Sequence, residues 1–224
     1  IWRAGFIPGL AVILIFLQPD FGTTATIAFI VFIQFLFSKT KLIYPALLSI
    51  GGWFIGRYFL ESEFYRAERL RVWSEGICNQ GQELLGACFQ VHQSRIAISS
   101  GGMFGLGPGT SRARWGSLPS AYSDFISSII GEEYGFIGYL IFIFILSICI
   151  ITFFLIAVRE KNEFKKIFIS GLGAWILFQS VLNLGASVYL LPITGIVLPF
   201  VSYGGTAMVS IFVALGIMHC RVDE

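Results

Sequence analysis

One apolar run decides the fold class: residues 134–158 read YGFIGYLIFIFILSICIITFFLIAV. It contains no charged side chain, and it is longer than the roughly 20 residues that an α-helix needs to cross the hydrocarbon core of a bilayer. Four similar runs lie at 21–38, 42–60, 167–190 and 199–219, and a shorter run lies at 4–17. The sequence therefore predicts an all-α, polytopic transmembrane helical bundle with about six helices.

The composition excludes a water-soluble domain. Hydrophobic residues make up 56% of the chain and charged residues only 12%, about half of the charged fraction of an average soluble domain. The mean hydropathy is +0.80. We therefore expect lipid to be the solvent, and we expect no nucleic-acid partner. Because the first residue is Ile and no signal-peptide flank is present, we also expect the chain to be a piece of a longer protein.

The lysines predict the orientation of the bundle. All five lie in two short loops, at positions 39 and 41 and at positions 161, 165 and 166. Lysine-rich short loops face the cytoplasm, so both loops are predicted to lie inside, and residues 61–133 and 190–199 then lie outside. The prediction is a single membrane domain, 1–224, with one large extracytoplasmic loop, 61–133.

The outer loop contains two cysteines, Cys78 and Cys88. An oxidising exterior permits a disulfide between them, but the sequence alone leaves the pairing open. Residues 84–98 predict a helix lying at the interface. The apolar segment 125–130 is too short to cross the membrane, so it predicts a re-entrant or interfacial piece.

Four acidic residues lie near predicted membrane boundaries, where ionisable groups are costly and usually face a cavity. Asp20 follows Gln18-Pro19 and opens an apolar run, so we interpret it as an N-cap. Asp124 could be an N-cap or a catalytic base, and the sequence does not separate the two. Glu132 and Glu133 could pair with outer-loop arginines, but a solvated helix start is the simpler interpretation.

Two glycine-containing segments also allow two interpretations each. Residues 101–109 could be a flexible hinge, or, with arginines on both sides, a site for an anionic headgroup, because arginine forks and consecutive backbone N–H groups suit pyrophosphate. Residues 191–206 carry two prolines and a Ser-Tyr-Gly-Gly run. They could pack helices through small residues, or line a polar cleft with Gln179 and Asn183, which share one face of the preceding helix.

Several segments resemble the motifs of one family. The matches are QPDFGT at 18–23, QSRIAI at 93–98 with the glycines of 101–107, SDFI at 123–126 with GEEYGF at 131–136, and LPFVSYGGTA at 198–207. They run in family order, and the chain is identified as a member of the SEDS family (shape, elongation, division and sporulation). The family bundle has more helices than are expected here, so the resemblance implies a C-terminal portion. RodA-like and FtsW-like features both occur, which leaves elongation and division open.

The resemblance implies a function. The family polymerises lipid II into peptidoglycan glycan strands at the outer face of the bacterial plasma (inner) membrane, so it implies a lipid II-dependent glycosyltransferase with a multi-pass location there. The implied partners are lipid II, the growing glycan strand, a class B penicillin-binding protein as the transpeptidase, and membrane proteins of the elongasome or divisome. A lipid II flippase and a non-catalytic scaffold are the alternatives.

The resemblance also assigns roles to residues. Asp124 stands at the position of the catalytic base. Residues expected to bind substrate, chiefly its pyrophosphate, are Arg71, Arg95, Arg112, Ser202, Gly204 and Gly205, and the supporting residues are Asp20, Glu132 and Glu133. A divalent cation, Mg²⁺ or Mn²⁺, could assist the arginines, and no other cofactor is expected. The chain departs from the family pattern at Ser120, at Tyr122 and at Tyr189, where a small residue is usual.

Overall fold

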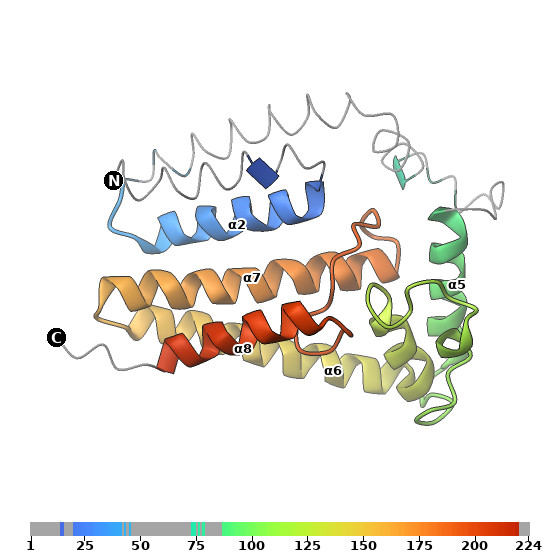
Figure 1. The fold of residues 1–224 in the computed structure, drawn as a ribbon. Helices are drawn as coiled ribbons and strands as arrows, with labels where there is room; N and C mark the ends of the chain where they lie inside the picture. Colours follow the sequence, from blue (N-terminus) through green and yellow to red (C-terminus); the bar gives the residue numbers. More distant parts are fainter. Residues whose placement is uncertain are drawn as a thin grey trace. The chain divides into compact units, whose positions relative to one another are not determined.

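A computed structural model describes residues 14–15, 20–41, 43, 45, 73–74, 76, 78 and 87–219. These residues form helices and turns, with no strand among them. The elements are α2 (Phe21–Phe37), α5 (Ala87–Ser100), the 3₁₀ helix η2 (Ala113–Trp115), α6 (Ile126–Arg159), α7 (Glu163–Ser187) and α8 (Gly205–His219) (Figure 1). The all-α prediction is confirmed for this part of the chain.

Helices α6 and α7 are long and apolar enough to cross a membrane, and α2 and α8 are shorter apolar helices. Helices α2 and α7 lie close to the predicted runs 21–38 and 167–190. Helix α8 begins six residues later than predicted, at Gly205, because residues 199–204 form turns after Pro199. The predicted runs at 4–17 and 42–60 lie mostly outside the described residues.

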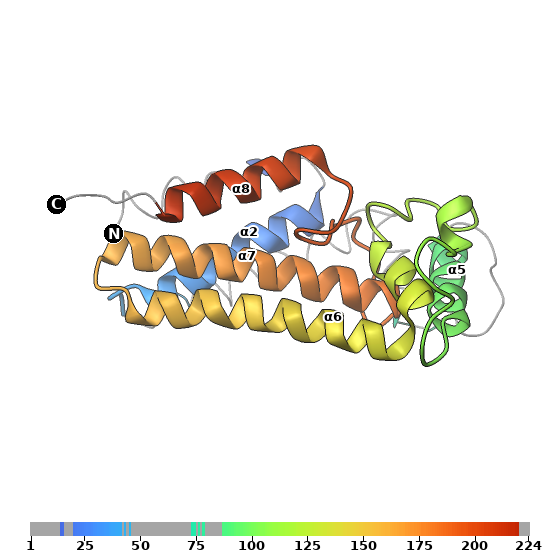
Figure 2. The ribbon, with the colours of Figure 1, turned by 90° about the horizontal axis from the view of Figure 1, so that it is seen from below.

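The chain divides into two compact units. Unit 1 comprises Ile1–Arg57, Cys149–Phe178 and Val209–Glu224, and unit 2 comprises Tyr58–Ile148 and Gln179–Met208. In unit 1, the last part of α6 and the first part of α7 run side by side (Figure 2).

Apolar contacts and one close approach hold α2 against α7 in unit 1. Phe29 stacks on Phe178, with ring centroids 4.7 Å apart. A Cβ atom at Gly171 would lie 2.4 Å from the side-chain nitrogen of Gln34. Glycine at this position therefore lets the two helices pack closely, as small residues do between membrane helices.

An ion pair joins the two lysine-bearing loops of unit 1. Lys39 Nζ lies 2.9 Å from Glu163 Oε1, and both side chains are substantially exposed. Such a solvated pair adds little stability. It nevertheless places both loops at the same end of unit 1, in agreement with the prediction that they share one side of the membrane.

Unit 2 has its own small apolar core. Its buried members come from α5, η2, the following turns and the start of α6: Ala97, Ala113, Leu118, Ala121, Phe125 and Ile129. Two half-buried side chains, Ile126 and Ile193, pack against it. The predicted helix at 84–98 is confirmed as α5, and a disulfide between Cys78 and Cys88 ties the preceding segment to its first turn. A ring of this size contributes roughly 2–3 kcal/mol.

Helix α6 contains a break at Gly135, whose φ and ψ are 68° and −170°. The glycine-rich loop 101–109 packs directly on this break, since a Cβ at Gly105 would lie 2.1 Å from the carbonyl oxygen of Glu133. Backbone N–H groups of Leu106 and Phe136 donate to the carbonyls of Glu132 and Gly102, at 3.0 and 2.8 Å. The loop is thus fastened to α6, and the hinge interpretation finds no support. The short apolar piece predicted at 125–130 forms the turns of α6 before the break.

Candidate functional site

Asp124 lies in a tight turn immediately before α6. The carbonyl of Ser120 accepts the backbone N–H groups of Ser123, Asp124 and Phe125, at 3.2, 3.0 and 3.4 Å. The Phe125 ring is only 1% exposed, so it anchors the turn in the core of unit 2. This arrangement holds the backbone of Asp124 while its own side chain stays half-buried.

The Asp124 carboxylate has no hydrogen bond or ion pair with the described residues. In particular, it accepts no N–H group from the first turn of α6, so the N-cap interpretation of Asp124 is not supported. Its Oδ2 atom lies 3.8 Å from the place that a Cβ at Gly195 would occupy. Gly195 has φ +70°, a conformation that glycine adopts without strain. The carboxylate therefore remains free to accept a proton from a bound group.

Asn183 holds the backbone of Asp124 through a hydrogen bond, a role that the sequence alone does not assign. It is 2% exposed, and its side-chain amide donates to the carbonyl oxygens of Asp124 and Ile196, both at 2.8 Å. One side chain on α7 thus ties the Asp124 turn to the 190–199 segment. The sequence predicts only that Asn183 shares a helix face with Gln179 and could line a polar cleft, whereas the structure buries its side chain.

Ser202 is the second residue that holds this turn through hydrogen bonds, and its side chain is buried rather than exposed. It is 5% exposed; its hydroxyl donates to the carbonyl of Ser123 at 2.6 Å and accepts the N–H of Leu198 at 2.7 Å. The hydroxyl therefore both donates and accepts a hydrogen bond within the protein. The contact of Ser202 with substrate stays a prediction. Gly204 is half-buried and Gly205 is exposed at the start of α8, where a side chain would meet open space.

Three non-glycine residues in the described part of the chain have positive φ: Ser120, Tyr189 and Phe200, with values of 55°, 64° and 66°. All three lie in unit 2. The carbonyl of Ser120 accepts the N–H of Asp124, and Phe200 lies two residues before Ser202, whose hydroxyl donates to the carbonyl of Ser123. Such conformations cost free energy and gather at functional sites. The left-handed backbone at Tyr189 also explains why a small residue suits this position.

Glu132 is buried and fully engaged, so the predicted solvated helix start is wrong at this residue. It is 2% exposed. The carboxylate accepts the Ser111 hydroxyl at 2.6 Å, the N–H groups of Arg112 and Ala113 at 3.1 and 3.2 Å, and the Ser100 hydroxyl at 3.4 Å. A charged acceptor with four donors fixes the turn at 111–115 to α6. This pairing uses backbone N–H groups, not the arginine guanidinium that was the other alternative.

Glu133 is also buried, at 8% exposure, which again contradicts a solvated start. Its Oε1 atom has no hydrogen-bond partner within the described structure. A buried, unpaired carboxylate oxygen is costly. This oxygen of Glu133 is therefore expected to lower stability, in contrast to the carboxylate of Glu132, which accepts four hydrogen bonds.

The arginines differ in what they contact. Arg112 is exposed, and its guanidinium makes no hydrogen bond or ion pair with the described residues, so it can receive an anion. Arg95 is exposed on α5 and lies near Tyr189, where its charge partly opposes the rise that burial causes in the pKa of that phenol. Arg71 lies outside the described residues.

Two further expectations concern Asp20 and a metal ion. Asp20, in unit 1, caps α2: its Oδ1 accepts the Thr23 N–H at 3.0 Å, which confirms the N-cap interpretation. No cluster of three or more His, Cys, Asp or Glu side chains suited to a metal occurs among the described residues.

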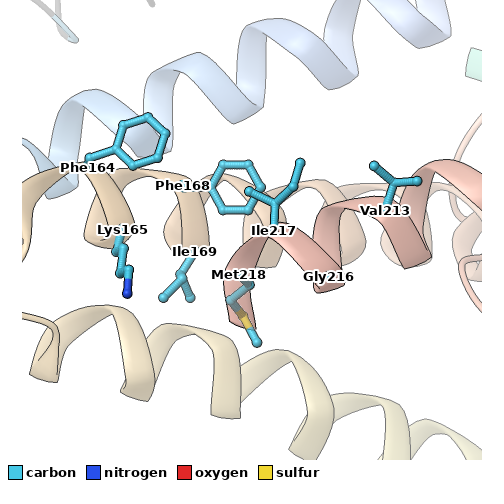
Figure 3. Close-up of a pocket in the computed structure, with 8 residues that line it drawn as sticks. All are labelled: Phe164, Lys165, Phe168, Ile169, Val213, Gly216, Ile217 and Met218. Atoms are coloured by element: carbon cyan, nitrogen blue, oxygen red, sulfur yellow. The ribbon is translucent and has the colours of Figure 1, made fainter. Parts of the chain in front are cut away.

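A separate pocket of about 490 Å³ lies in unit 1 between α7 and α8 (Figure 3). Its lining is Phe164, Lys165, Phe168, Ile169, Val213, Gly216, Ile217 and Met218. Apart from the cation of Lys165, these side chains are apolar.

These observations define a class of protein: a helical protein with two helices long and apolar enough to cross a membrane, and with an unpaired carboxylate on a hydrogen-bonded turn. The model of the family described as cell cycle protein, which covers FtsW, RodA and SpoVE, matches residues 4–223. The chain belongs to this family, and it is accordingly a membrane protein of the kind that acts in cell-wall synthesis and cell division.

Two curated relatives and one solved structure are similar to the chain. The probable peptidoglycan glycosyltransferase FtsW of Bacillus subtilis is 37% identical over 92% of this chain and 52% of its own length. Stage V sporulation protein E of the same organism is 31% identical over 97% of this chain and 60% of its own length. The chain thus spans little more than half the length of these relatives.

The solved structure comes from work titled "Structural coordination of polymerization and crosslinking by a peptidoglycan synthase complex". It covers 94% of this chain and 59% of the matched chain, with a TM-score of 0.68 at 23% identity. At this level of identity the likeness concerns the fold alone. It agrees with an all-helical bundle.

Proposed function

We propose that the protein polymerises lipid II into glycan strands at the outer face of the bacterial plasma membrane. The relatives named as probable peptidoglycan glycosyltransferases support the reaction class. The single observation that carries the proposal is the free carboxylate of Asp124, held on a turn braced by Asn183 and Ser202. A carboxylate held in place but not consumed by an internal contact is what a general base requires.

In this mechanism Asp124 accepts the proton of the attacking sugar hydroxyl as that oxygen bonds to the anomeric carbon of the other sugar. The bond from that carbon to the undecaprenyl pyrophosphate breaks, and the pyrophosphate leaves with the electron pair. Arg112, with an unengaged guanidinium, stabilises the charge that grows on it. Glu132 holds the backbone of Arg112 in place. Arg95 and Arg71 are proposed to assist.

The proposed orientation places residues 61–133 at the outer face and the loops of Lys39 and Lys161 inside. The lysine distribution supports it, as does the Lys39–Glu163 pair, which holds both loops together. An impermeant thiol reagent applied to intact cells should not label a cysteine introduced at Lys161. Labelling of this cysteine from outside would contradict the proposed orientation.

The proposed partner is a class B penicillin-binding protein, which would cross-link the new strands within the elongation or division machinery. The synthase complex named for the structural relative is consistent with this kind of partner. The partner is not needed for the chemistry at Asp124, so the two parts of the proposal can be tested separately.

Purified full-length protein in vesicles with labelled lipid II separates the proposed reaction from its alternatives. Polymer that grows without an added partner supports the glycosyltransferase. Transfer of lipid II between leaflets without polymer would replace it with a flippase. If the protein shows neither activity but still binds the transpeptidase, the scaffold alternative would be favoured.

A further inference from the structure

Unit 2 carries an exposed aromatic–arginine cluster, formed by Arg114, Trp115 and Tyr122. The guanidinium carbon of Arg114 lies 6.0 Å from the ring centroids of both Trp115 and Tyr122, and its Nε–H donates to Tyr122 Oη at 3.3 Å. Trp115 is 79% exposed and Tyr122 is 45% exposed. The cluster therefore presents two aromatic rings and a cation at the protein surface.

The cluster is held in a fixed place. Glu132 accepts three hydrogen bonds from the turn at 111–115, and the N–H of Arg114 donates to the Ser111 hydroxyl at 3.3 Å. On the other side, the carbonyl of Tyr122 accepts the N–H of Tyr203 at 2.9 Å. Tyr122 is also two residues before Asp124. The aromatic–arginine cluster and Asp124 thus belong to the same hydrogen-bonded part of unit 2.

We propose that this cluster is a carbohydrate-binding subsite that holds the glycan strand next to Asp124, an inference that rests on the proposed function. A pyranose ring has an apolar C–H face, which packs on the electron-rich face of an aromatic ring, while its hydroxyls and N-acetyl oxygens accept hydrogen bonds from groups at the ring edge. Trp115 and Tyr122 supply the faces. Arg114, with several N–H donors, supplies the edge.

The other explanation for exposed aromatic residues is an anchor at the membrane–water interface, where Trp and Tyr are enriched. An anchor needs only an amphipathic ring. It does not need a turn fixed by a buried carboxylate, nor an arginine within 6.0 Å of two aromatic ring centroids, one of them two residues before Asp124. These features favour the glycan subsite, and the experiment makes the anchor one of its outcomes.

The test uses full-length protein in lipid nanodiscs and a lipid-free tetrasaccharide of alternating N-acetylglucosamine and N-acetylmuramic acid, with binding measured by calorimetry. Trp115→Ala should weaken binding roughly five- to tenfold, the loss expected for one aromatic contact, and Trp115→Phe should restore most of it. Phe104→Ala is the matched control, because Phe104 is 83% exposed but lies on the glycine-rich loop. It should bind like the parent.

Equal binding by the parent, Trp115→Ala and Phe104→Ala overturns the subsite. Equal binding with lower melting temperatures for both alanine variants assigns the rings to the interface and also overturns it. Asp124→Asn should bind the tetrasaccharide normally. If the parent makes no polymer but its tetrasaccharide binding depends on Trp115, the proposed polymerase is wrong and the subsite stands. If the parent polymerises lipid II but does not bind the tetrasaccharide, only the subsite is wrong.

Discussion

Asp20 and Asp124 occupy equivalent positions in the sequence but opposite states in the structure. Each lies just before a helix, with a proline a few residues upstream. The Asp20 carboxylate is consumed by the Thr23 backbone and hydroxyl at the start of α2. The Asp124 carboxylate has no such contact, because the turn before α6 is held by the Ser120 carbonyl and by Asn183 instead.

Glu132 and Glu133 repeat this difference within unit 2. One accepts four hydrogen bonds, and the other has a buried oxygen with none in the described structure. A carboxylate that is fully engaged stabilises a local structure, whereas one that is left unengaged lowers stability and remains available for chemistry. In the described residues, hydrogen bonding within the protein therefore distinguishes Asp20 and Glu132 from Asp124 and Glu133.

The largest effect is expected for Asp124→Asn. The two side chains are nearly isosteric, and no internal contact of the carboxylate is lost, so the variant should fold with unchanged stability. Its rate of lipid II polymerisation should fall about 10²- to 10⁴-fold, the contribution of a general base. Asp20→Asn is the matched control, because Asn also caps helices, and its rate should stay within a few fold of the parent. Equal rates for both variants would break the comparison.

The glutamates should differ in stability. Glu132→Ala leaves buried donors around the 111–115 turn without an acceptor, and it should lower the free energy of unfolding by about 2–3 kcal/mol. Glu133→Gln removes a buried, unpaired charge, so it should leave stability unchanged or raise it. Thermal unfolding in detergent measures both, and proteolysis near residue 112 should quicken only in the first variant. A strong loss in Glu133→Gln would mean that Glu133 has a partner after all.

Asn183 tests whether bracing matters for catalysis. Asn183→Leu removes both amide donors beneath Asp124 and Ile196, so the carboxylate should be less well placed. We expect kcat to fall about 10- to 100-fold, the loss corresponding to two such hydrogen bonds, with KM nearly unchanged. Gln179→Leu, one turn earlier on the same face, is the control, because Gln179 has no polar contact among the described residues. Equal rates for the two leucine variants would reduce Asn183 to a packing residue.

Local signals in the sequence were enough for some features and not for others. The apolar runs predict α2 and α7, and the Asp20 cap follows from its position before α2, because these depend on neighbours within one helical turn. The role of Glu132 could not be predicted, since its four donors lie about twenty to thirty residues away in sequence. Acids before an apolar run usually mark a solvated boundary, and only the folded turn at 111–115 reverses that interpretation.

The smallest effect is expected at Asp20, and it completes the comparison. Asp20→Ala removes the acceptor for the Thr23 N–H, so it should destabilise α2 by about 1 kcal/mol, the usual cost of a lost N-cap, whereas Asp20→Asn should cost only a few tenths. Because this carboxylate is already engaged inside the protein, the polymerisation rate per folded molecule should be the same in both variants. Unfolding curves and rates measured on the same preparations check the two statements together. If Asp20→Asn keeps full stability but loses polymerisation, Asp20 acts on the substrate, and engagement by an internal contact no longer distinguishes the two aspartates.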